Sequence, residues 1–232
     1  MKAAHRQGGF TLIEIAIVLV IIGLLLGGIL KGQELITSAR VRNLISQQDG
    51  IKAAFYGFQD RYRALPGDYQ LAAQNLGGTG TISFGNGDGR VQNGVTPVGG
   101  SVADEANLVW EHMTRAGFLN GNFTYAAGAP TDASTPKNPY GAFVQLVYDN
   151  TYGAGGGPAR HNLKTGSQVP VEIMAEVDRK TDDGNPLTGS FVFSAFGGTG
   201  TAPTDASCYV AATSSWKLSG ATEVNCGGAT LL

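Results

Sequence analysis

One carboxylate lies inside a long apolar stretch near the beginning of the chain. Between Phe10 and Leu30 the only ionisable side chain is that of Glu14. At about 1.5 Å per residue, a helix over this stretch is roughly 30 Å long, which is the thickness of a bilayer's hydrocarbon core. A carboxylate at that depth costs about 2.5–3.5 kcal/mol on insertion scales. An anchor that only had to sit in lipid would not need this group, so we expect Glu14 to have a partner.

The residues before the apolar stretch suggest what that partner is. Lys2 and Arg6 make the first residues basic, and a pair of glycines precedes Phe10. Cleavage between Gly9 and Phe10 would create a new α-amino group four residues before Glu14. That amine is cationic at neutral pH, so it could neutralise Glu14 of the same chain or of a neighbouring copy.

Residues 9–14, with the sequence Gly-Phe-Thr-Leu-Ile-Glu, are followed by an unbroken apolar helix. This motif resembles that of the prepilin family, which comprises type IV pilins and the pseudopilins of type II secretion. The resemblance implies that prepilin peptidase cuts between Gly9 and Phe10, that Phe10 becomes N-methylated, and that Glu14 registers each subunit in a filament. An ordinary secretory signal peptide would instead be cut after its apolar region, and no such site follows Leu30.

One long helix, predicted from Phe10 to Ala64, positions Glu14. Its second half is amphipathic, because apolar residues recur at three- and four-residue steps. These residues are Val41, Leu44, Ile51, Phe55, Phe58, Tyr62 and Leu65. Pro66 and the Pro-Gly-Asp turn chemistry that follows end the helix.

We therefore predict an α+β fold in which the long helix packs on a mainly antiparallel β-sheet head, as in pilins. The predicted parts are a leader at 1–9, a transmembrane or filament-core helix at 10–30, the amphipathic half at 31–65 and a globular head at 66–232. Residues 77–100 are predicted to form a surface loop. Predicted strands cover 142–148, 169–177, 190–196 and 209–213, because these segments are rich in Val, Phe and Tyr.

A short helix is predicted after Ser101 and up to Ala116, because residues 101–104 resemble a capping box with Asp in its last position. His112 on this helix is predicted to be a surface or partly packed residue. The carboxylates of Glu105 and Glu111 are predicted to be solvated.

The two cysteines, Cys208 and Cys226, lie in the C-terminal part of the chain. If the head lies outside the cytoplasm, we expect them to pair, which the chain-entropy model values at roughly 3 kcal/mol. The alternative is two free thiols. Their spacing does not fit a metal site, which would need further Cys or His nearby.

Two acidic segments are candidates for calcium binding. Asp178, Asp182 and Asp183 are either oxygen ligands for calcium or members of a tight turn that joins two strands. Residues 86–89, Asn-Gly-Asp-Gly, lack the spacing of a calcium loop and are predicted to be a plain turn. The turn interpretation explains both segments without a metal, so no cofactor is predicted and calcium remains an alternative.

Composition and motifs argue against two other functions. The chain has 232 residues, a formal net charge of −2 and 15% charged residues, so no broad basic surface for nucleic acid is expected. No phosphate loop, nucleophile elbow or zinc-binding helix occurs in the sequence, and no enzyme activity is predicted.

Three functions remain open. The first is a structural subunit, major or minor, of a type IV pilus-like filament, held in the bacterial inner membrane with its head in the periplasm before assembly at the cell surface. The second is a pseudopilin of a periplasmic type II secretion pseudopilus. In both, the implied partners are prepilin peptidase, other pilin subunits in a homo- or hetero-filament, the inner membrane and the pilus or secretion assembly machinery. The third is a membrane-tethered periplasmic binding protein that never polymerises.

The helix also departs from the pattern of the family. Many pilins and pseudopilins carry a proline near the junction of the two helix halves, whereas no proline precedes Pro66 here. This departure and the large head suggest a minor subunit at the filament tip. A disulfide near the C-terminus is common in pilins, so the predicted Cys208–Cys226 bond favours the pilin over the pseudopilin.

Overall fold

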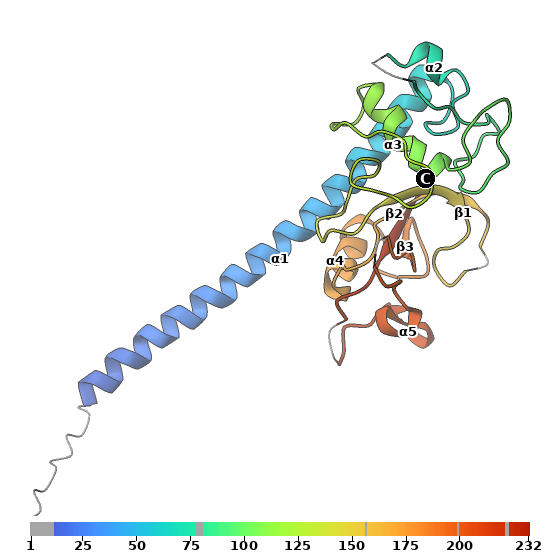
Figure 1. The fold of residues 1–232 in the computed structure, drawn as a ribbon. Helices are drawn as coiled ribbons and strands as arrows, with labels where there is room; N and C mark the ends of the chain where they lie inside the picture. The colour runs from blue at the N-terminus through green and yellow to red at the C-terminus, as the bar shows by residue number, and fades with distance from the viewer. Residues whose placement is uncertain (1–11, 78–80, 156, 199, 221–222) are drawn as a thin grey trace, which may run out of the picture. The chain divides into compact units, whose positions relative to one another are not determined.

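The computed structural model describes residues 12–77, 81–155, 157–198, 200–220 and 223–232. It confirms the predicted α+β, pilin-like arrangement, in which a long N-terminal helix is followed by a mostly antiparallel β-sheet head (Figure 1). The chain divides into two compact units, residues up to Arg40 and Val41–Leu232. Gly9 and Phe10, the predicted cleavage site, lie outside the described residues.

Helix α1, Leu12–Tyr62, contributes to both units. The elements that follow it are α2 Ala72–Asn75, α3 Glu105–Arg115, β1 Gln145–Asp149, β2 Arg160–Lys164, α4 Val171–Thr181, β3 Phe191–Phe193, α5 Asp205–Cys208, β4 Tyr209–Val210, the 3-10 helix Ala211–Thr213, β5 Ser215–Trp216 and β6 Gly228–Leu231. Four strands form an antiparallel sheet in the order β1-β2-β6-β3, and β4 and β5 form a separate two-stranded ribbon.

The second half of α1 buries the apolar face that its sequence pattern predicts. The buried side chains on this face, including one polar residue, are Val41, Leu44, Gln48, Ile51, Ala54, Phe55 and Phe58. Because most of them recur at steps of three and four residues, they form one stripe along the helix. This stripe holds the head on α1.

The stripe contributes to three hydrophobic clusters in turn. Leu44 packs with α4 and β3 in the first cluster, which also contains the disulfide. Phe55 packs with α3, β1 and β2 in the second. Phe58 packs with Tyr69 and Ile82 in the third. The core of the head is therefore laid out along the helix, one cluster after another.

The end of α1 shows why its last residues leave helical geometry. The amide of Arg63 still donates to the carbonyl of Gln59, but Arg63 itself has a φ of 53°, in the left-handed region. Gly67 follows with a φ of 91°, and a Cβ added there would lie 2.7 Å from the carbonyl oxygen of Glu105. Only glycine therefore lets the turn after the helix approach α3 this closely.

One ion pair joins the ends of β1 and β2. Lys164 Nζ lies 2.5 Å from Asp149 Oδ2 and also donates to the hydroxyl of Thr151. Hydrogen bonds and the positive charge of Lys164 lower the pKa of Asp149 despite its desolvation. Desolvation lowers the pKa of Lys164, which is almost fully buried. Asp149 therefore neutralises the buried cation of Lys164, which would otherwise be costly in the interior of the head.

The predicted strand at 169–177 is wrong, because this segment forms helix α4. Its buried residues include Ile173, Met174 and Val177, which fall on one face of a helix. Asp178 consequently lies in the last turns of α4, and the connection to β3 begins at Asp182 and joins a helix to a strand rather than two strands.

The other strand predictions had mixed outcomes. The strands predicted at 142–148 and 190–196 correspond to β1 and to β3. The strand predicted at 209–213 is only two residues long, because Ala211–Thr213 turns into a 3-10 helix, and it belongs to the ribbon rather than to the main sheet. Strands β2, β5 and β6 were not predicted.

The predictions for the segment before α3 and for α3 itself also need correction. The helix begins at Glu105 without a side-chain cap, because the hydroxyl of Ser101 accepts a hydrogen bond from Val98 and a carboxylate oxygen of Asp104 accepts one from Gly128. Glu105, Glu111 and His112 are buried rather than solvated or on the surface. Within the predicted surface loop, the side chains of Ile82 and Val91 are also buried.

Candidate functional site

Glu14 lies in the first turn of α1 as the structure describes it. A carboxylate is favoured there, because the unpaired amides at the beginning of a helix carry partial positive charge. Its neighbours Ile13 and Ile15 expose 67% and 47% of their surface. The predicted partner of Glu14, the amino group of Phe10 after cleavage, lies outside the described residues.

The first unit of the chain presents a continuous apolar surface. Large apolar side chains are exposed along this part of α1, namely Leu12, Ile13, Ile15, Ile17, Val18, Leu19, Val20, Ile21, Ile22, Leu24, Leu25, Leu26, Ile29, Leu30, Leu35 and Ile36. By length and composition the helix can cross a membrane, and the apolar window that qualifies it has no buried residue. Exposed patches of this extent mark surfaces that lipid or another protein covers.

The predicted disulfide is present between Cys208 and Cys226, with a Cα–Cα distance of 5.7 Å. Cys208 ends α5, and Cys226 forms an isolated antiparallel bridge with Val169, directly before α4. Both sulfurs lie in the first hydrophobic cluster. The bond therefore fastens the β4–β5 ribbon and its flanking loops to α4.

The carboxylates of Asp178, Asp182 and Asp183, which the sequence suggested as calcium ligands, do come together. One oxygen of each lies within 4.8 Å of the others. In the structure these oxygens accept hydrogen bonds from protein donors. Asp178 accepts from the Trp216 indole at 2.7 Å, and Asp182 accepts from the Phe191 amide at 3.0 Å.

The remaining carboxylate of this group, that of Asp183, accepts from the hydroxyl of Thr188 at 2.6 Å. Desolvation raises the pKa of Asp178 to about 6, with hydrogen bonds from Trp216 and Gly184 opposing the increase. Carboxylate oxygens are ligands that calcium prefers, so calcium binding here remains the alternative to the predicted turn.

A second acidic group brings together Asp68, Asp88 and Glu105, again with one oxygen of each within 4.8 Å of the others. The carboxylate of Asp68 accepts hydrogen bonds from the amides of Gly87, Asp88 and Gly89, and that of Glu105 accepts from Asn86 and Gln92. The two buried carboxylates thus hold residues 86–92 against α3.

This second group was not predicted as a unit. The Asn-Gly-Asp-Gly segment was predicted to be a plain turn, and nothing in its spacing connects it to Glu105. Desolvation raises the pKa of Glu105 to about 7, with repulsion from Asp68 and Asp88 adding to the increase. Burial raises the pKa of Asp68 as well.

The two histidines of the head have structural partners. The amide of Gly67 donates to His112 Nδ1 at 2.9 Å, so His112 Nε2 carries the proton and donates to the carbonyl of Ser83 at 3.0 Å. Burial lowers the pKa of His112 to about 4. His161 Nε2 accepts from the amide of Val91 at 3.2 Å. Both rings therefore connect loops to the core.

The fold and the exposed apolar helix define a protein of pilin-like architecture, in which one helix of the described residues is long and apolar enough to span a membrane. A family model described as the prokaryotic N-terminal methylation motif matches residues 4–30 of the chain. The chain thus carries the prepilin-type N-terminal motif, which is consistent with the type IV pilin and pseudopilin family. Among curated proteins and among solved structures, none matches the chain. The motif points to a structural protein.

Proposed function

We propose that this chain is a structural subunit, major or minor, of a type IV pilus-like filament. Prepilin peptidase cleaves it between Gly9 and Phe10, and Phe10 is N-methylated. Before assembly the subunit is held in the bacterial inner membrane by its apolar helix, with the head in the periplasm. The assembly machinery then draws it into a filament with other pilin subunits, through a head-to-tail contact that does not close into a ring.

One observation carries this proposal: the N-terminal methylation motif is followed directly by a helix whose apolar side chains are exposed and whose first described turn holds Glu14. Outside the membrane, packing of that surface among like helices shields it from water, which stabilises the filament against dissociation by about 25 cal/mol for each Å² covered. Neutralisation of Glu14 by the new amino group of a neighbouring subunit would then select one register among the possible helix contacts.

The mass of the mature chain tests the first step. We expect the purified protein to lack residues 1–9 and to carry one additional methyl group on its new N-terminus. A membrane-tethered binding protein that never polymerises would not be expected to show this change. A chain that keeps these nine residues in cells with working peptidase contradicts the proposal.

Glu14→Ala tests the assembly step. We expect the variant to reach the membrane normally but to form few or no filaments, because it lacks the carboxylate that would pair with a neighbour's amine. Glu34→Ala is the matched control, since Glu34 is the other carboxylate of the first unit and pairs with Lys31 at 2.7 Å. Normal filament yield from Glu14→Ala, measured by shearing and electron microscopy, argues against the registry role.

A pseudopilin of type II secretion is the second candidate. The Asp178, Asp182 and Asp183 group favours it, because the resemblance implies that some secretion pseudopilins bind calcium in a loop of the head. For such a protein we expect added calcium to raise the thermal midpoint of the head and Asp183→Asn to remove the effect. No shift with calcium favours the pilus subunit, as does the C-terminal disulfide.

A further inference from the structure

Residues 86–90 form a short segment, here called the strap, whose backbone amides all donate to carboxylate oxygens. The donors and their acceptors are, in order, Asn86 to Glu105, then Gly87, Asp88 and Gly89 to Asp68, and Arg90 to Asp88. Amides in helices and strands donate to carbonyl groups, which do not titrate. The strap is instead held in place by side chains whose charge depends on pH.

Backbone hydrogen bonds fix the chain on both sides of the strap. Before it, the carbonyl of Phe84 accepts from the amide of Val102 at 3.0 Å. After it, the carbonyl of Val91 accepts from the amide of Tyr148 at 2.6 Å. These bonds join groups that do not titrate, so the strap can open between two fixed points while the rest of the head stays folded.

The two carboxylates that hold most of the strap are buried, and they lie close to a third. Glu105 is 0% exposed and Asp68 is 5% exposed, and one oxygen of each lies within 4.8 Å of one oxygen of Asp88. The charges that act on Glu105 are those of Asp68 and Asp88, and both are negative. Ionisation of Glu105 therefore creates a charge that is desolvated and repelled, which favours an arrangement that admits water.

The ionisable groups that reach this region from the strap and from the sheet have other partners. The guanidinium of Arg90 lies over the ring of Tyr148, 5.2 Å from its centre. On β2, His161 Nε2 accepts from the amide of Val91 at 3.2 Å, so this atom carries no proton. Burial lowers the pKa of His161, and the charge of Asp88 opposes that decrease.

The ionisable groups on α3 and directly before it are also accounted for. Asp104 Oδ2 accepts from the amide of Gly128 at 2.8 Å. His112 follows Glu105 by about two turns, and burial lowers its pKa to about 4, so it is neutral at neutral pH. The charges on Glu105 are thus dominated by the two neighbouring carboxylates, which oppose its ionisation.

We propose that the strap is pH-sensitive and opens when Glu105 loses its proton. With the proton in place, the closed strap brings together two negative charges instead of three. Opening returns the carboxylate oxygens to water and separates Asp88 from the two buried carboxylates. The pKa of Glu105 rises from 4.5 to about 7 in the closed state, so linkage makes full exposure of this group about 70-fold more frequent at about pH 8 than at about pH 5.

Hydrogen exchange of the full chain in detergent tests this proposal. Protection factors, in which the intrinsic rate at each pH is divided out, are measured at about pH 5 and about pH 8. EDTA is present, so that no divalent cation binds the carboxylates. We expect the protection of residues 86–89 to fall at least about tenfold towards the higher pH. At about pH 8 it should also lie at least about tenfold below that of the β2 and β6 amides, which exchange when the whole head unfolds.

Two outcomes of this measurement overturn the proposal. Equal protection of the strap at both pH values would mean that ionisation of Glu105 does not open it. Equal protection of the strap and of the sheet at about pH 8 would mean that the strap opens only together with the whole head. Neither outcome touches the proposed filament, because the measurement uses the unassembled chain.

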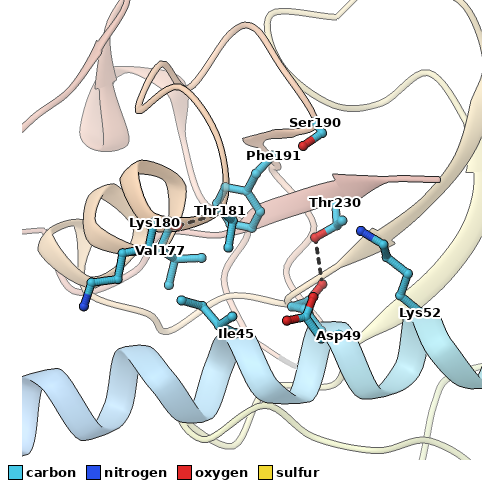
Figure 2. Close-up of a pocket in the computed structure, with 10 residues that line it drawn as sticks. Ile45, Asp49, Lys52, Val177, Lys180, Thr181, Ser190, Phe191 and Thr230 are labelled. Atoms are coloured by element: carbon cyan, nitrogen blue, oxygen red, sulfur yellow. Dashed lines mark hydrogen bonds between the residues drawn. The ribbon is translucent and has the colours of Figure 1, made fainter.

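Three variants assign the effect to Glu105. Glu105→Gln should remove the fall in protection, because Gln cannot ionise, and Asp88→Asn, at an exposed position, should make the fall smaller by removing one repelling charge. Asp49→Asn is the matched control and should keep the full response. Figure 2 shows Asp49 on α1, in a separate cavity of about 280 Å³ whose lining also includes Lys52. A fall that persists in Glu105→Gln, or opening towards low pH as protonation of His161 would cause, contradicts the proposal.

Discussion

Glu105→Gln should change the pH dependence of stability in a defined direction. Desolvation and the nearby charges of Asp68 and Asp88 raise the pKa of Glu105 from 4.5 to about 7 in the folded chain. The folded state therefore holds this proton more tightly than the unfolded state, which stabilises the fold below the unfolded pKa. That stabilisation is lost as the pH rises through the folded pKa.

The magnitude follows from the two pKa values. Between about pH 5 and about pH 8, linkage assigns Glu105 a loss of about 2.5 kcal/mol in the free energy of unfolding. Gln cannot titrate, so the free energy of unfolding of the variant lacks this pH dependence. The free energy of unfolding of the unmodified chain minus that of Glu105→Gln should therefore be about 2.5 kcal/mol larger at about pH 5 than at about pH 8. The amide group of Gln can accept a hydrogen bond from only one of the two backbone amides, those of Asn86 and Gln92. The lost hydrogen bond lowers the free energy of unfolding of the variant by the same amount at each pH.

Denaturant unfolding of the full chain in detergent measures this effect. Tryptophan fluorescence reports on the head, because the two tryptophans of the sequence, Trp110 and Trp216, are both buried there. His112→Gln is the control with the opposite sign. Burial lowers the pKa of His112 from 6.5 to about 4, so its stabilisation is lost as the pH falls, by about 2 kcal/mol over the same range. Equal destabilisation by Glu105→Gln at both pH values would refute the reasoning.

Three further predictions concern stability and use the same unfolding assay. Replacing Cys208 and Cys226 by Ala should lower the free energy of unfolding by about 3 kcal/mol. The reason is that the disulfide, whose cysteines are 18 residues apart, closes a loop and so lowers the conformational entropy of the unfolded chain. An unchanged free energy of unfolding would mean that the bond is strained or absent. Asp149→Ala should destabilise by about 3–5 kcal/mol, because it leaves the buried Lys164 uncompensated, whereas the double replacement Asp149→Ala with Lys164→Met should be nearly neutral. Phe58→Ala should destabilise by about 3–5 kcal/mol, because its ring is fully buried in the third cluster; a loss below about 1 kcal/mol would mean that the cluster collapses around the gap.

The long helix could be predicted from the sequence because its signals are local. The apolar period places Val41, Leu44 and Phe58 on one face, and Pro66 marks where helical geometry ends. The disulfide was also predictable, since the chain has only two cysteines and the expected location favours pairing. None of these inferences needs knowledge of which distant segments come together.

The parts that were predicted wrongly depend on such distant segments. Glu105 is buried because the amides of Asn86 and Gln92 fold back onto it, and His112 because Gly67 and Ser83 approach it from either side. No spacing in the sequence announces these contacts. A carboxylate or imidazole on a short helix therefore resembles an ordinary solvated residue until the loops around it are known.

Two other errors had a signal that was available. The segment 169–177 is rich in Val and Ile, but Pro170 directly before Val171 is compatible with the beginning of a helix, and Met174 and Val177 share its buried face. Arg115 stands four residues after Glu111, at the spacing of a helical ion pair, and the two lie 2.8 Å apart in the structure. The first pattern favours a helix over a strand, and the second favours an ion-paired carboxylate over a solvated one.

The order of strands in the main sheet has a consequence for how the head is made. Strand β6 lies between β2 and β3, although it follows both of them in the chain. The β1–β2 hairpin and β3 therefore have no shared neighbour while residues 228–231 are still inside the ribosome. Because such long-range pairing is slow, the sheet is completed only after residues 228–231 have emerged and paired with both β2 and β3.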